Sequence, residues 1–131
     1  AITSIQLHDG TIITGKSSTL MRAPSAALIN ALKHLAGIQD DLLLLSPSVL
    51  DPIIKLKLTQ LNYNNPRLHV NEVLLILAVS ATTNPIADLV LHQLEKLKGT
   101  QAHSSSILSF IDQNYYNKLK IELTTEPVLN K

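Results

Sequence analysis

The sequence predicts an α+β fold: a mixed sheet of four to five strands that starts with a β-hairpin, with helices packed on it around a buried central helix. Three observations predict it. Asp9-Gly10 lies between two strand-like runs, which is the strongest short-range hairpin signal. Residues 73–79 are apolar on all sides, as is typical of a helix buried on all sides. Strand-like and helix-like segments are interspersed without a regular alternation, which favours α+β over a doubly wound fold.

Length and composition fix the broad class of protein. The chain has 131 residues, which is one ordinary domain, and its 45% hydrophobic content excludes a disordered polypeptide. The formal net charge of +1 gives no basic excess, so we expect neither nucleic acid nor an anionic membrane as partner. Cysteine is absent, which excludes disulfides and thiol catalysis and fits a reducing, cytoplasmic location.

The first half of the chain predicts a hairpin, a helix, a short strand and a second helix. We expect these elements over residues 2–14, 24–37, 42–45 and 52–61. Pro24 suits the first turn of a helix and Gly37 suits the position just past its end. The four leucines at 42–45 fit a short buried strand, although their periodicity also allows a helical turn. Because proline inside a helix is costly, we expect only a short turn at 47–50 and the main helix from Pro52.

The second half predicts two longer helices and then a β-rich end. We expect helices over 71–81, 85–97 and 112–119, and strands over 102–111 and 121–125. Asn71, Asn84 and Asp112 are good N-cap residues for the three helices, and Gly99 closes the second. The apolar stretch 73–79 then lies at the centre of the molecule.

Residues 10–17 match the phosphate-binding pattern G-x-x-x-x-G-K-[ST]. Four β-branched residues occupy its middle, where a phosphate loop needs small and flexible ones, and no helical pattern follows until Pro24. The hairpin interpretation therefore accounts better for this segment. Lys16 stays a candidate ligand-binding residue because it lies at a loop.

A second candidate region precedes the predicted central helix. Asn65, Arg67 and His69 lie beside a helix N-terminus, whose free N–H groups and positive dipole favour anions. The alternative is that Arg67 pairs with a nearby carboxylate and serves only the structure.

His103 and Ser104 invite comparison with a serine nucleophile and its base. Adjacent residues on a strand point to opposite faces, so His103 would not reach Ser104, and a polar edge or interface is the better interpretation. His8, His34 and His92 fit structural or solvated positions. The histidine spacing predicts no metal site, and no cofactor is indicated.

Several blocks of the sequence together resemble a known family. The blocks are Asp9 to Lys16, Leu28 to Ile38, Asn65 to His69, Ala102 to Ser104 with Ile107 to Ser109, and Leu123-Thr124 with Glu126-Pro127. In this order they resemble the C-terminal part of the bacterial family called domain of unknown function 1846, over essentially the whole chain. Where relatives are expected to carry cysteine, this chain has Thr100 and Thr125.

The resemblance implies that this is the C-terminal domain of a longer protein, whose N-terminal part contains a glycine-rich segment suited to phosphate. It transfers no activity, and the matching positions to watch are Asn65, Arg67, His69, Asn84, His103 and Ser104. Two functional hypotheses follow. The first is a packing or homo-oligomerisation module that supports a ligand-binding N-terminal part. The second is a contribution of anion- or nucleotide-binding residues to an enzyme site at the boundary between the two parts.

Overall fold

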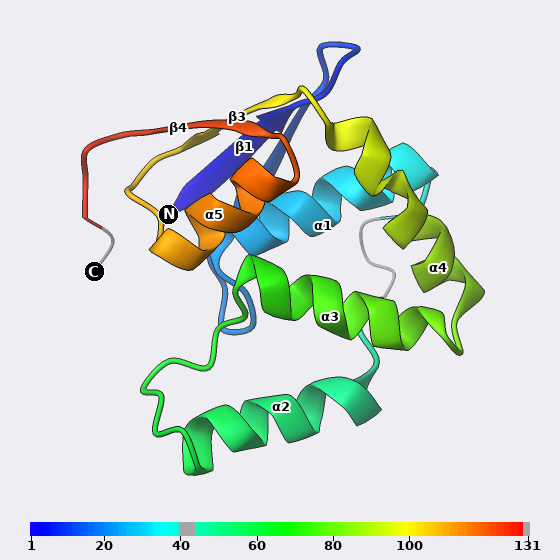
Figure 1. The fold of residues 1–131 in the computed structure, drawn as a ribbon, viewed down its shortest axis with the longest axis vertical. Coiled ribbons are helices and arrows are strands. Elements are labelled where there is room, and N and C mark those ends of the chain that lie inside the picture. The colour runs from blue at the N-terminus through cyan, green and yellow to red at the C-terminus, as the bar shows by residue number, and fades with distance from the viewer. Residues whose placement is uncertain (40–43, 130–131) are drawn as a thin grey trace.

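The structure, a computed structural model that describes residues 1–39 and 44–129, has a four-stranded sheet with helices on one face (Figure 1). The strands are β1 (Ile2–Gln6), β2 (Ile12–Lys16), β3 (Gln101–Ser104) and β4 (Glu122–Thr125). Their order in the sheet is β2-β1-β3-β4. β1 pairs antiparallel with both β2 and β3, and β3 pairs parallel with β4, so the sheet is mixed. The predicted α+β class and its opening hairpin are confirmed.

The helices form a layer beneath this sheet and a lobe below that layer (Figure 1). They are α1 (Ala23–Ala36), α2 (Pro47–Thr59), α3 (Val70–Ala81), α4 (Pro85–Leu91), the 3-10 helix η1 (His92–Leu97) and α5 (Phe110–Lys118). α1 packs on β1 and β2, α5 packs beside β4, and α3 lies against α1, α4 and α5. α2 packs chiefly on α3 and forms the lobe.

Alternation along the strands separates the two faces of the sheet. Thr3, Ile5, Ala102 and Ser104 face the helices and are buried, while their neighbours along the strands face outward. Gly15 allows β2 to approach α1 closely, since a Cβ there would overlap the backbone of Ala27. The core beneath is aliphatic, as the composition predicts, apart from the buried Tyr116, whose hydroxyl donates to Pro24 O at 2.7 Å.

α3 is less enclosed than the sequence predicts. Val73, Ile76 and Leu77 are buried, but Leu75 is 65% exposed and Val79 is 51% exposed. The prediction of a helix buried on all sides is therefore wrong for this chain. The reason is tertiary, because α1, α4 and α5 cover one side of α3 and α2 covers only part of the other.

Three helix boundaries differ from the sequence prediction. α2 begins at Pro47, with Ser46 as N-cap, and continues through Pro52, which lies inside the helix and so leaves the Ser48 carbonyl without its usual backbone donor. α3 begins one residue early, at Val70, with His69 and not Asn71 as N-cap. Residues 92–97, expected as α-helix, form the tighter η1, in keeping with the short 3-10 runs that often end helices.

The β-rich end is also shorter than predicted. β3 ends at Ser104, not at residue 111, and Ser109 caps α5 by accepting the N–H of Asp112. The predicted strand at 42–45 falls partly on residues 42–43, which lie outside the described residues. Leu44 and Leu45 are buried but belong to no strand.

Candidate ligand-binding edge of the sheet

One edge of the sheet collects the ends of three strands and the starts of three helices. Strand registers bring the C-terminal residues of β2, β3 and β4, namely Lys16, Ser104 and Thr125, to the same edge as the start of β1. α1, α3 and α5 begin beside this edge, as the backbone pairing of Leu68 with Met21 and the contact between α3 and α5 show. We call this side of the sheet, where these three strands end, the carboxyl edge. In open α/β sheets, ligands bind at such edges.

Asp112 is the centre of a buried hydrogen-bond cluster at the carboxyl edge. Its Oδ1 accepts the backbone N–H of Val70 at 2.9 Å. Its Oδ2 accepts from the His69 imidazole Nδ1 at 3.2 Å and from the Ser109 hydroxyl at 3.0 Å. The side chain of Asp112 is 1% exposed, so these three donors replace the water that a carboxylate otherwise needs.

Burial alone would raise the pKa of Asp112, because it disfavours the charged form. The hydrogen bonds from His69, from the Val70 N–H and from Ser109 outweigh it, and the pKa lies below its ordinary value. The carboxylate is therefore charged at neutral pH. Burial, together with this nearby negative charge, raises the pKa of Tyr116 far above its ordinary value.

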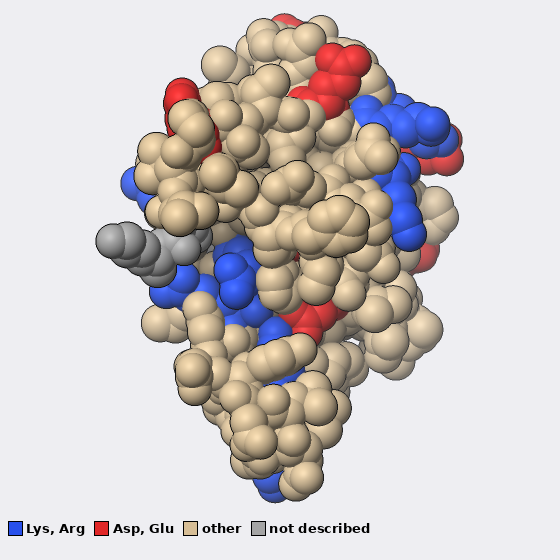
Figure 2. Space-filling view, turned by 60° about the vertical axis from the view of Figure 1, so that its left-hand side comes forward, with Lys and Arg blue, Asp and Glu red and all other residues tan. Residues whose placement is uncertain are grey.

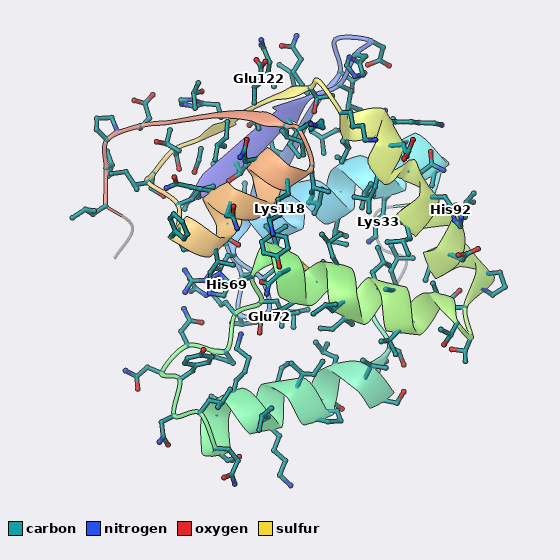
Figure 3. All side chains as sticks on the ribbon, viewed as in Figure 1. Lys33, His69, Glu72, His92, Lys118 and Glu122 are labelled. Carbon is teal, nitrogen blue, oxygen red and sulfur yellow. The ribbon has the colours of Figure 1, made fainter. Side chains whose placement is uncertain are left out.

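A second polar contact fixes the chain that leads into α3. Lys57, which is almost fully buried on α2, donates from Nζ to Glu72 Oε1 at 2.8 Å and to Arg67 O at 3.0 Å. Glu72 Oε1 also accepts the backbone N–H of His69 at 2.8 Å. Figure 3 shows His69 and Glu72 together at the start of α3. The ion pair of Lys57 and Glu72 thus holds α2, α3 and the loop between them together.

A cavity of about 270 Å³ opens at the carboxyl edge beside Asp112. Its polar lining includes Arg22, Ser109 and Asp112, and its apolar lining includes Ile107 and Leu129. Arg22 Nε is buried, with no hydrogen-bond partner in the part of the chain that the structure describes. Figure 2 shows this side of the molecule, where Lys and Arg atoms gather at a hollow above the lower lobe, with acidic atoms beside them.

The cluster of Ser109, His69 and Asp112 does not have the geometry of a nucleophile and its base. In such a relay the hydroxyl and the carboxylate contact opposite nitrogens of the imidazole. Here Ser109 Oγ lies 3.4 Å from His69 Nδ1, the same nitrogen that donates to Asp112. The cluster therefore caps helices and positions the cavity wall.

The structure divides the predicted site residues into separate groups. Asn65, Arg67 and His69 lie in the segment that enters α3, where Asn65 Oδ1 accepts the N–H of Arg67 at 3.0 Å. Asn84 caps α4 by accepting the N–H of Ile86 at 3.0 Å, as predicted for its helix position. Its side chain thus has a structural partner away from the start of α3.

Lys16 and His103 lie on the outward face of the sheet, whereas Ser104 is fully buried on the helix-facing side. The expectation that His103 does not serve Ser104 is consistent with this alternation. The sequence analysis missed Arg22 and Ser109 as lining residues and assigned Asp112 only as a cap. Arg22 could have been noticed as the other arginine of the chain, directly before a helix start.

The described residues carry no helix of the length and apolarity that crossing a bilayer requires. Within residues 1–39 and 44–129, no group of three or more His, Asp or Glu side chains is placed to hold a metal ion. His69, His92 and His103 contact carboxylate, backbone and hydroxyl groups, respectively.

The fold and the carboxyl edge define an α+β domain with a small polar cavity at the strand ends. The sequence profile of the C-terminal region of the domain of unknown function DUF1846 matches residues 1–131. The chain belongs to this family.

The similar proteins are all named UPF0371 proteins. A UPF0371 protein of Corynebacterium aurimucosum is 48% identical over 125 residues, which is 95% of this chain and 25% of that protein. A relative in Fusobacterium nucleatum is 47% identical over 125 residues, with the same coverage of both proteins. A relative in Clostridioides difficile is 46% identical over 126 residues, or 96% of this chain and 25% of its own length. The chain thus spans about a quarter of the length of these relatives.

Proposed function

We propose that this chain is a packing domain that docks its carboxyl edge against the rest of a longer protein and helps to enclose a ligand site there. The supporting observation is a group of exposed apolar side chains at that edge. The group comprises Ile107, Phe110, Ile111, Val128 and Leu129. Phe110 is 83% exposed and Leu129 is 74% exposed, although burying such a side chain stabilises a protein by about 1.5–3 kcal/mol.

The total surface supports the same proposal. The accessible surface is 7532 Å², whereas a compact monomer of 14.3 kDa exposes about 6,800 Å². The chain therefore exposes roughly 700 Å² more than a compact monomer of its size, as expected of a domain with a face that another part of the protein covers. Relatives about four times longer supply a chain long enough to cover it.

The test uses the full-length protein with Phe110→Ser. We expect a lower unfolding midpoint and faster proteolysis at the boundary of this domain, because the lost contact lies between parts of the chain. Ile12→Ser, which also removes an exposed apolar side chain but lies on the outward face of the sheet, is the matched control. Equal behaviour of the two variants would contradict docking through the carboxyl edge.

A second candidate function is binding of an anionic or nucleotide-like ligand at this boundary. Arg22 Nε favours it, being buried in the cavity without a hydrogen-bond partner among residues 1–39 and 44–129, with Arg67 and His69 nearby along the segment that pairs with residues 20–22. Phosphate or nucleotide should then raise the melting temperature of the full-length protein, and Arg22→Gln should abolish this effect. Lys55→Gln, on the exposed side of α2, should preserve it.

We also propose that the protein is cytoplasmic and forms homo-oligomers. The absence of cysteine fits a reducing compartment, and the exposed side of α3, with Leu75 and Val79, fits a contact with a second copy. Sedimentation of the full-length protein tests self-association. A Leu75→Glu variant should dissociate the oligomer, and a strictly monomeric wild type would contradict the proposal.

A further inference from the structure

The outward face of the sheet carries an ordered array of polar side chains. Strand registers place Gln6 beside Gln101, and Gln101 beside Glu122, in one row across the sheet. The next row places Ser4 beside His103 and His103 beside Thr124. All six side chains point to the same face because successive residues of a strand alternate between faces.

These rows line a groove of about 330 Å³, which Ile12 and Ala102 complete. Ligand pockets for small molecules begin at about this size. Among the described residues, the eight that line the groove include no lysine or arginine, and one of them, Glu122, is acidic. The groove therefore offers neutral hydrogen-bonding groups and a carboxylate, and it lacks the cations that would favour a phosphate.

His103 is held in a fixed orientation at this groove although its side chain is 49% exposed. Its Nε2 donates to Glu126 Oε1 at 3.2 Å. In the neutral ring, Nδ1 then accepts from the Thr124 hydroxyl, 2.7 Å away. These two contacts, from β4 and the residue after it, hold the ring in one orientation beside the groove, which reduces the side-chain entropy that binding would cost.

From this array we propose that the groove binds a neutral, hydroxyl-rich small molecule such as a sugar or polyol. Each hydroxyl of such a ligand both donates and accepts hydrogen bonds. The Gln6 and Gln101 amides supply donors and acceptors, and Glu122 supplies an acceptor. His103, which Glu126 holds in place, forms one end of the groove. Because the groove is open, the expected dissociation constant is about millimolar.

The experiment is saturation-transfer NMR on the full-length protein with glucose, mannose, ribose, erythritol and sorbitol, each at a concentration well above the expected dissociation constant. At least one should show transfer, and inorganic phosphate should not compete. His103→Ala and Gln101→Leu should each weaken binding at least fivefold. His92→Ala is the matched control, because His92 is also an exposed histidine beside a carboxylate, on another part of the surface.

Circular dichroism of each variant establishes that it is folded, and His103→Gln replaces His103→Ala if the alanine variant fails to fold. No transfer to any of the five neutral ligands overturns the proposal. It is also overturned if phosphate competes, or if the substitutions at His103 and Gln101 leave binding unchanged. None of these outcomes bears on docking through the carboxyl edge, which the Phe110 variant tests separately.

Discussion

The Asp112 carboxylate on α5 caps α3 across 42 residues of sequence, accepting the backbone N–H of Val70 at 2.9 Å. The first N–H groups of a helix have no partner within the helix, and here a buried side chain from another helix supplies one. The same carboxylate accepts from His69 and Ser109, so one residue joins the starts of two helices at the carboxyl edge.

Replacement of Asp112 by alanine should lower the free energy of unfolding by about 2–4 kcal/mol, because three donors, that of Val70 buried and the other two partly buried, lose a charged acceptor. Denaturant unfolding measures the change. Asp88→Ala is the control, since Asp88 is half-exposed and its contact with His92 lies on the surface, where such pairs contribute little. A loss at Asp112 no larger than that at Asp88 would show that the cap is unimportant.

Protonation of the Asp112 carboxylate should lower the free energy of unfolding in acid. Its folded-state pKa lies below the ordinary value of 3.8, so the native state favours the charged form. The resulting stabilisation is fully present above the unfolded-state pKa and is lost as the pH falls through the folded-state pKa. Unfolding free energies measured between pH 2 and 6 should therefore fall less steeply below about pH 4 in Asp112→Asn than in the wild type.

Gly15→Ala should destabilise the protein by more than about 2 kcal/mol, since the new methyl group would overlap the backbone of α1 at Ala27. Backbone atoms of a packed helix cannot move aside as a flexible side chain can. Thermal unfolding measures the effect. Thr14→Ala, one residue earlier and facing outward, should change stability only slightly. A tolerated alanine at position 15 would mean that β2 and α1 are less closely packed than the structure shows.

The buried pair of Lys57 and Glu72 should show a larger coupling energy than the exposed pair of Lys98 and Glu95. A double-mutant cycle should give about 1 kcal/mol or more for the first, because Lys57 is shielded from water, and roughly 0.2–0.5 kcal/mol for the second. Lys57→Met and Glu72→Gln, singly and together, provide the cycle. Equal coupling in the two pairs would contradict the proposed tie between α2 and α3.

Two nearby leucines of α3, one buried and one exposed, should respond differently to replacement by alanine. Leu77→Ala should cost about 2–5 kcal/mol in denaturant unfolding of this chain, because Leu77 is fully buried and leaves a cavity. Leu75→Ala should cost less than about 0.5 kcal/mol when the chain is measured as a monomer, because its side chain is then largely exposed. Similar losses at the two positions would mean that α3 is enclosed on both sides after all.

The sequence predicted those elements whose signals are local. Asp9-Gly10 specifies the hairpin turn, where Gly10 adopts a positive φ of 91°, and Gly37 ends α1 with a φ of 72°. Asn84 before Pro85 specified the start of α4. These signals act through a few neighbouring backbone groups, so they need no knowledge of the rest of the chain.

The sequence by itself therefore determined the α+β class, the hairpin, the helix ends marked by glycine and proline, and membership of the family. Only the tertiary structure decided that one side of α3 stays open, that Asp112 serves Val70 and His69, and that Arg22 lines a cavity. These relationships join residues far apart in the chain. Local patterns record which residues favour a helix or a strand, but not which distant partner will satisfy a buried charge or cover an apolar face.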